Sequence, residues 1–218
     1  MKTSQSVANQ LHRLLGRFSG FYWLAITQTF YRPAFGALGA RSRIIQPLKL
    51  RNMENIFIGR RVTVARHSWL FTLPAIPGRV PKLVIEDGCQ IGNFNHITCV
   101  NSVTLGASVL TADRVHISDN SHGYENPDVP ITDQPVVSKG PVTIGAGSWL
   151  GENVSILSCS IGRNCVIGAN AVVTRDIPDF CVVVGAPGRV IKQFDPVSKT
   201  WKSVQPKTEA LKQPRHNP

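Results

Sequence analysis

The chain has 218 residues, an apolar fraction of 42% and a formal net charge of +11, a composition that suits one sizeable globular domain with short appendages. Its positive charge lies toward the two ends: residues 1–66 carry eleven Lys and Arg against one Glu, whereas residues 67–195 carry eight against eleven acids. A nucleic-acid binder concentrates basic residues on its folded domain, so this distribution excludes that class and favours anionic lipid surfaces or phosphorylated small molecules as partners.

The five cysteines form no C-x-x-C pair and lie mostly in apolar, strand-like runs. We therefore expect them to be reduced core residues rather than part of a disulfide framework or a metal cluster. Lys2 is followed by polar residues instead of a continuous apolar run with a cleavage site, so the start of the chain does not have the pattern of a secretory signal. Both features predict a cytoplasmic protein.

In chain order, the first predicted element is a helix over residues 6–32, with a wide apolar face beside Arg13 and Arg17 and with Pro33 marking its end. Two interpretations stay open. The helix packs on the domain that follows or on a neighbouring subunit, or it lies on a membrane surface as a basic amphipathic helix. Residues 1–49 are accordingly expected to form a helical, basic extension.

A six-residue repeat follows. Aliphatic anchors, with one Thr among them, recur at positions 58, 64, 70, 85, 91, 97, 103, 105, 111, 117, 144, 150, 156, 161, 167 and 173. The residue four places after an anchor is usually small or β-branched. A period of six matches neither a helix nor a single alternating strand, but it suits short strands that form the flat sides of a three-sided coil. Residues 50–192 are therefore predicted to form a parallel β-solenoid with the anchors and the small residues pointing inward.

Two long interruptions, Thr72 to Leu83 and Ser118 to Thr143, break the repeat. Loops that leave a rigid solenoid are natural places for functional residues, and the second one contains His122 and Tyr124. After the solenoid, residues 193–218 are polar and basic and are expected to form an irregular, disordered tail.

Three runs resemble the hexapeptide-repeat acyltransferases over roughly residues 50–192: Asn93-Phe-Asn-His-Ile-Thr, Val115-His-Ile-Ser-Asp-Asn-Ser-His-Gly and Gly185-Ala-Pro-Gly. The galactoside and maltose O-acetyltransferases and the O-antigen and capsule O-acetyltransferases are the most similar groups. The resemblance implies an all-β, left-handed parallel β-helix, a homotrimer with active sites between adjacent prisms, and transfer of acetyl from acetyl-CoA to a sugar hydroxyl in surface polysaccharide synthesis. It implies no permanently bound cofactor and no metal.

The same resemblance assigns residues to roles. His122 falls on the catalytic base, a role that suits an imidazole because its ordinary pKa lies near 6.5. Asp119 would orient or tune that base, or cap a turn. The acceptor contacts would be Asn93, Asn95, Asn101 and Tyr124, and the acyl-CoA contacts would be Trp149, Gly151, Ala169, Arg189 and Lys192. The acid that the family carries after its Asn-Phe-Asn run is missing here, where Asn101-Ser102 stands, which points to a different sugar.

Simpler interpretations stand beside these roles. Asn93 could only shape a corner, Trp149 could belong to a subunit interface, and Arg189 and Lys192 could be solvated charges. A zinc site like that of γ-class carbonic anhydrases, with His96, His116 and His122, is a rival class, although the spacing of six between the last two departs from that family. A non-catalytic scaffold is another, but it would leave the second interruption without a purpose. The basic ends suggest peripheral contact with the inner face of an anionic membrane.

Overall fold

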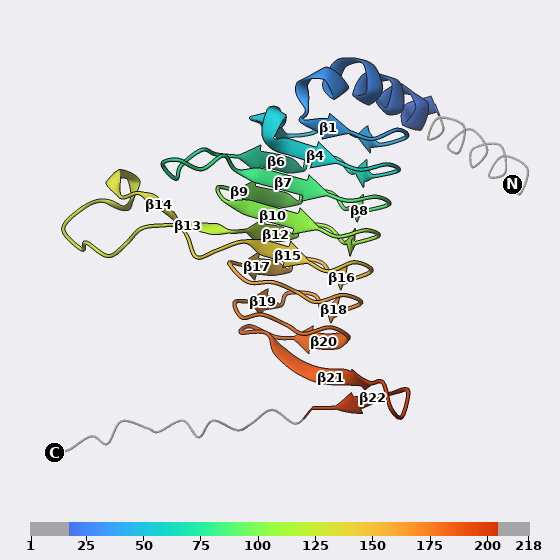
Figure 1. Cartoon of the computed structure of the whole chain (residues 1–218), viewed down its shortest axis with the longest axis vertical. Helices are drawn as coiled ribbons and strands as arrows, with labels where there is room; N and C mark the ends of the chain where they lie inside the picture. Colours follow the sequence, from blue (N-terminus) through green and yellow to red (C-terminus); the bar gives the residue numbers. More distant parts are fainter. Residues whose placement is uncertain (1–17, 205–218) are drawn as a thin grey trace, which may run out of the picture.

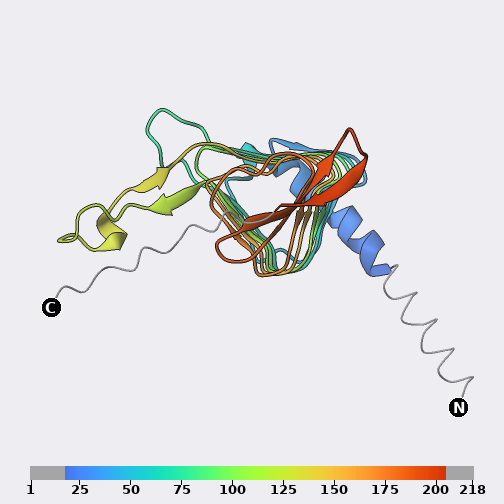
Figure 2. The ribbon, with the colours of Figure 1, turned by 90° about the horizontal axis from the view of Figure 1, so that it is seen from below.

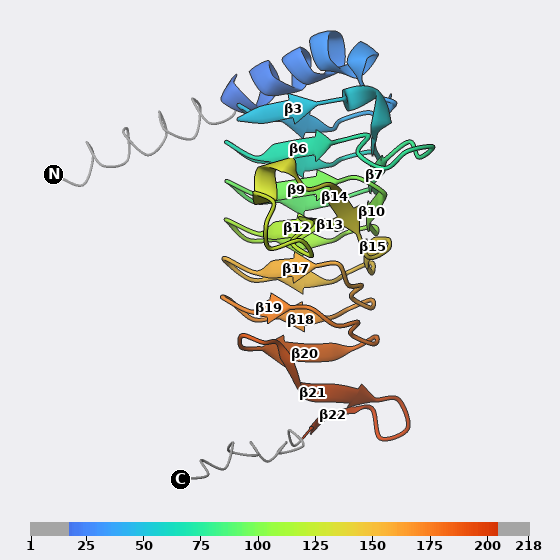
Figure 3. The ribbon, with the colours of Figure 1, turned by 90° about the vertical axis from the view of Figure 1, so that its left-hand side faces the viewer.

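The computed structural model describes residues 18–204 as a tall three-sided prism (Figures 1 and 2). Face A contains β1 (Ala37–Leu38), β4 (Ile56–Ile58), β7 (Lys82–Ile85), β10 (Ser102–Leu105) and β15 (Val142–Ile144). Face B contains β2 (Arg43–Ile44), β5 (Thr63–Val64), β8 (Gln90–Ile91), β11 (Leu110–Thr111), β16 (Trp149–Leu150), β18 (Val166–Ile167) and β20 (Cys181–Val184). Face C contains β3 (Lys49–Arg51), β6 (Trp69–Thr72), β9 (His96–Cys99), β12 (His116–Ser118), β17 (Ser155–Leu157) and β19 (Val172–Val173), stacked in Figure 3.

The chain visits the faces in the order A, B, C, and each strand pairs in parallel with the strand one coil away. We name the prism edges after the faces that meet there, so the chain crosses the C/A edge whenever it leaves face C. The parallel solenoid predicted from the six-residue period is thus present.

The core fills the prism as the period requires. None of the sixteen anchors is more than 3% exposed, including Thr111, whose hydroxyl accepts a hydrogen bond from Gly92 N–H at 3.0 Å. Each fully buried aliphatic side chain stabilises the fold by about 1.5–3 kcal/mol. The five cysteines are free and buried in this core, as expected.

The coils begin earlier than residue 50, the start that the six-residue repeat predicts. β1 pairs with β4, and β3 pairs with β6, so residues 37–49 already belong to the solenoid. Leu38, Ile44 and Leu50 are spaced by six, but the step from Leu50 to Ile58 is eight because η3 lies between them. The helical extension is correspondingly shorter.

A helix lies on the first coil. Residues 18–26 are α-helical, and the chain continues through η1 (Thr27–Tyr31) and η2 (Arg32–Ala34), where Pro33 ends it as expected. The remainder of the helix predicted over residues 6–32 lies outside the described residues. Gln28 Nε2 donates to the carbonyls of Gly39 and Ser42 at 3.1 and 2.9 Å, so the end of this helical segment packs on the first coil, as the first interpretation predicts.

The lower end differs from the irregular tail predicted from residue 193. β21 (Arg189–Asp195) turns back antiparallel to β20, and β22 (Thr200–Ser203) pairs with β21. The alternating apolar and polar residues of this hairpin pack Phe194 against Phe180 and Trp201, with ring centroids 6.0 and 5.6 Å apart. Residues 205–218 of the predicted tail lie outside the described residues.

Both interruptions of the repeat occur at the C/A edge. Residues 73–81 connect β6 to β7, and residues 119–141 connect β12 to β15. The second segment, which we call the arm, contains β13 (Asn120–His122), β14 (Val136–Ser138) and η4 (Ile131–Asp133) and reaches far from the prism (Figures 1 and 2). A third C/A crossing contains η3 (Met53–Asn55).

Candidate active site

His122 is the last residue of β13 and is exposed on the arm. Its strand pairs antiparallel with β14, with His122 opposite Val136. The next residue, Gly123, donates its N–H to the Pro135 carbonyl at 2.8 Å, and an added Cβ there would meet the same oxygen at 3.0 Å. The backbone of His122 is therefore held by a two-stranded ribbon at the point where the ribbon leaves the prism.

Asp119 begins the arm and is completely buried. Its carboxylate accepts hydrogen bonds from the backbone N–H groups of Val100, Asn101 and Ser102 at 2.8–2.9 Å, and from Asn120 Nδ2 at 3.0 Å. Within residues 18–204, no hydrogen bond joins it to His122. Asp119 therefore has a clear local role, because it fixes the root of the arm to the tight corner of the neighbouring coil.

Asn101 lies at that corner, partly exposed, and its side-chain oxygen accepts a hydrogen bond from Arg79 Nη1 at 2.7 Å. Tyr124 lies two residues beyond His122 on the arm and is 68% exposed. Asn101, His122 and Tyr124 therefore share the C/A edge. Arg79 was not singled out from the sequence, although the Pro77-Gly78 turn signal immediately before it marks a loop tip.

Asn93 and Asn95 lie on the opposite side of face C, at the B/C edge. Asn93 Nδ2 donates to both carboxylate oxygens of Asp113 at 3.1 and 3.2 Å, and its Oδ1 accepts the Arg66 N–H at 3.2 Å. Asn95 is fully buried and donates to the Ala112 carbonyl at 2.9 Å. Asn95 points into the prism, four residues after the anchor Ile91, so a bound acceptor cannot reach its side chain.

Trp149 points outward from face B and is 44% exposed. In register, Trp149 is followed down the face by Val166, Val182 and Lys192, which makes one outward column. Three strand spacings of roughly 4.8 Å separate its ends by about 14 Å. Arg189 lies on the same strand as Lys192, and both are exposed.

Gly151 and Ala169 stack at the B/C edge beside this column. Gly151 N–H donates to the Ile167 carbonyl at 2.8 Å, and an added Cβ would meet Ala169 N at 2.7 Å. Glycine is therefore required at residue 151 for the close approach of two corners, while Ala169 remains exposed.

The predicted site residues of one chain therefore form two separate groups, one at the C/A edge and one on face B. Figure 2 shows the arm leaving one corner of the three-sided prism. That corner is the C/A edge, which lies opposite face B, so the cross-section of the prism separates the arm with His122 from Trp149 on face B. One chain does not bring the predicted base and the predicted acyl-donor contacts together.

The other histidines form a stack on face C. The rings of His96 and Trp69 have centroids 3.8 Å apart, and His96 and His116 have centroids 6.1 Å apart. Burial lowers the pKa of both histidines, Lys49 adding to the effect on His96 and His96 to that on His116. In the part of the chain that the structure describes, no group of three or more His, Cys, Asp or Glu is placed to hold a metal ion.

Cys99 lies close to the C/A edge, but its thiol is a poor nucleophile. Burial, reinforced by the nearby Asp119 carboxylate, raises the pKa of Cys99 to about 12, so the sulfur stays protonated at neutral pH. His122 places an exposed imidazole at the same edge.

Residues 141–175 match the family model described as "Bacterial transferase hexapeptide (six repeats)". The chain is 33% identical over 185 residues to the Escherichia coli protein named "Putative lipopolysaccharide biosynthesis O-acetyl transferase WbbJ", covering 81% of this chain and 87% of that protein. It is 36% identical over 165 residues to the galactoside O-acetyltransferase of Escherichia coli, covering 71% and 75%.

The fold has matches among solved structures. AntD, an N-acyltransferase from Bacillus cereus solved in complex with dTDP and 3-hydroxybutyryl-CoA, superposes with a TM-score of 0.64 over 77% of this chain and 87% of that one, at 18% identity. The coil register and the relatives point to the same group, and the chain belongs to the hexapeptide-repeat O-acetyltransferase family, with its left-handed parallel β-helix.

Proposed function

We propose that this protein transfers an acetyl group from acetyl-CoA to a hydroxyl of a saccharide in surface polysaccharide synthesis. The observation that carries the proposal is the position of His122, an exposed imidazole fixed on a ribbon at the prism edge. The two E. coli relatives, one named for lipopolysaccharide biosynthesis and one for galactoside O-acetylation, support the choice of substrate class.

The proposed step needs a base and no covalent enzyme intermediate. The neutral imidazole of His122 takes the hydroxyl proton as the sugar oxygen attacks the thioester carbonyl. The tetrahedral intermediate collapses, the carbon–sulfur bond breaks, and the departing thiolate takes the proton from the imidazolium. The products are the O-acetyl sugar and CoA-SH, and the enzyme returns to its starting state.

We propose that the acyl donor lies along face B. Trp149 at the top of the outward column would contact the acyl end, and Lys192 and Arg189 near its foot would meet phosphate groups of CoA, which suit cationic donors. The length of about 14 Å fits an extended pantetheine chain. Gly151 and Ala169 would let the backbone approach the donor at the adjoining edge.

We propose that the active site is shared between subunits of a homotrimer. Support comes from the separation within one chain: the C/A edge of one prism carries His122, and face B of another would supply the donor column. Asn93 and Tyr124 would contact the acceptor from the two sides of this junction. In this proposal Asp119 and Asn95 do not contact the acceptor. Asp119 holds the corner beside His122, and Asn95 holds the corner beside Asn93.

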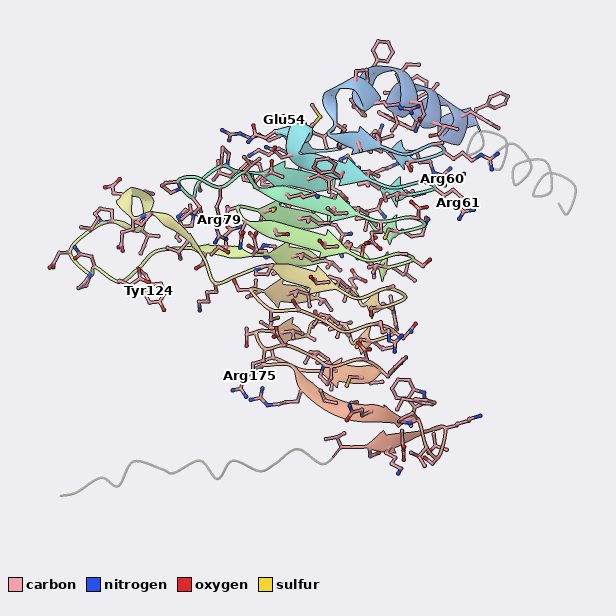
Figure 4. All side chains as sticks on the ribbon, in the orientation of Figure 1. Glu54, Arg60, Arg61, Arg79, Tyr124 and Arg175 are labelled. Atoms are coloured by element: carbon pink, nitrogen blue, oxygen red, sulfur yellow. The ribbon has the colours of Figure 1, made fainter. Side chains whose placement is uncertain are left out.

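Peripheral contact with the cytoplasmic face of an anionic membrane is proposed from the top of the prism. Four aromatic residues of the helix are strongly exposed: Phe18 (70%), Phe21 (66%), Tyr22 (58%) and Phe30 (73%). The exposed Arg60 and Arg61 lie on the coil beneath (Figure 4). Within residues 18–204, no helix has both the length and the apolar character needed to cross a bilayer.

The catalytic proposal is tested by CoA-thiol release from acetyl-CoA across a panel of saccharides. We expect His122→Ala to lower kcat by about 10²–10⁴ because the hydroxyl loses its base, with little change in the KM for acetyl-CoA. His116→Ala, which alters a histidine of face C instead of the arm, is the control and should retain kcat. Full activity of His122→Ala would eliminate the proposed base.

A further inference from the structure

A second loop shares the edge from which the arm projects. Residues 73–81, which we call the arginine loop, contain three prolines, and their tip is a tight turn in which Arg79 N–H donates to the Ile76 carbonyl at 3.1 Å. Pro77 and Gly78, whose φ is +73°, occupy the two central positions, the arrangement of a type II turn. The loop is therefore stiff and presents Arg79 in one place.

Arg79 has an oriented guanidinium but no acidic partner. Its Nη1 donates to Asn101 Oδ1 at 2.7 Å, and among residues 18–204 the three ion pairs involve other arginines and lysines. Since a guanidinium carries five N–H donors, four remain for a ligand, and the Nδ2 of Asn101 makes no hydrogen bond within the described part of the chain. Cationic and neutral donors thus gather at one exposed corner, while the Asp119 carboxylate beneath them is fully buried and already accepts backbone N–H groups.

This corner is attached directly to the arm that carries His122. The Asp119 carboxylate binds the N–H groups of Asn101 and Ser102, and Asp119 is the first residue of the arm. From Asp119 to His122 the chain is extended for three residues, a span of about 10 Å. A monosaccharide with one charged substituent can bridge such a span.

We propose that Arg79 and Asn101 bind an anionic group of the acceptor, a phosphate or a carboxylate, while the hydroxyl to be acetylated lies at His122. The planar fork of an arginine matches the paired oxygens of both groups. This inference rests on the proposed function and makes it more specific: the acceptor is an acidic saccharide. Asn101 fixes the fork, and the prolines of the loop reduce the entropy lost when the anion binds.

The test is isothermal titration of the full chain at pH 7 with glucose 1-phosphate, glucuronate and glucose. We expect Arg79→Gln to weaken binding of the anionic sugar by about 10- to 100-fold, the value of a charged hydrogen-bonded contact, and to leave glucose unchanged. Arg79→Lys should give an intermediate loss because it keeps the charge but not the fork. The preferred anion in the unmodified protein identifies the source as phosphate or carboxylate.

Arg175→Gln is the matched control, because Arg175 is an exposed arginine further down the same side of the prism (Figure 4). It should bind all three sugars like the unmodified protein. Equal weakening by Arg79→Gln and Arg175→Gln, equal weakening of glucose and the anions, or no weakening at all would overturn the proposal.

Measurements of CoA-thiol release distinguish failure of the anion site from failure of the proposed transferase activity. If Arg79→Gln loses anion binding but no acceptor supports CoA-thiol release, the anion site stands and the transferase proposal fails. If the enzyme acetylates neutral and acidic saccharides and Arg79→Gln keeps the KM of the acidic ones, only the anion site fails.

Discussion

Asp119 shows how much a single buried carboxylate can organise. It has no exposed surface, yet three backbone N–H groups and one side-chain amide saturate its oxygens. The sequence motif around it predicts a functional segment, but its partners are eighteen or so residues away and depend on the stacking of one coil on another. The same holds for Asn93, whose clamp with Asp113 is visible only once the coils are in register.

We predict that Asp119→Asn lowers the free energy of unfolding by about 2 kcal/mol, because an amide replaces a charged acceptor of three N–H groups. Urea denaturation measures this loss, and Asp128→Asn, which changes an exposed acid of the arm, should leave the unfolding midpoint unchanged.

At the scale of elements, all sixteen anchors predicted from the period of six face inward, because burial in a narrow prism favours aliphatic or small side chains. The start of the coils is not predicted, because the spacing of six among Leu38, Ile44 and Leu50 is followed by a step of eight to Ile58. The terminal hairpin was missed because β21 and β22 pair antiparallel, outside the repeat. The separation of the predicted site residues between the C/A edge and face B follows from chain order around the prism, which no local motif encodes.

The N-terminal helix carries a prediction of its own. The double variant Phe21→Ser, Phe30→Ser should bind vesicles of phosphatidylserine and phosphatidylcholine about tenfold or more weakly, because two rings exposed by 66% and 73% would no longer enter the lipid interface. Vesicle co-sedimentation measures the change. Val197→Ser, at a site that is 91% exposed near the opposite end of the prism, is the control. Equal binding of the unmodified protein to neutral and anionic vesicles, or to neither, would contradict the electrostatic part of the proposal.

At the scale of the whole molecule, the proposed active site needs residues from two chains. His122 and Trp149 lie on opposite sides of one prism, so a shared site predicts complementation between two defective chains. His122→Ala and Trp149→Ala, co-refolded in equal amounts and assayed at acetyl-CoA well below its KM, should recover about a quarter of the unmodified activity, since half of the chains supply each intact side. Each variant refolded alone should stay at its low activity, and a mixture that gains nothing would place both residues in the site of one chain.

The two ends of the prism limit the length of the solenoid, to which further strands could otherwise be added. A coil leaves unpaired backbone groups above and below it, and such edges recruit further strands. At the top, Thr27 Oγ1 accepts a hydrogen bond from the Ile44 N–H at 2.9 Å, and Gln28 Nε2 donates to two carbonyls of the first coil. At the bottom, β21 pairs antiparallel with β20, the last parallel strand of face B, and β22 pairs with β21. The top of the first coil and the lower edge of face B are thus covered by the chain itself, which disfavours end-to-end stacking of prisms.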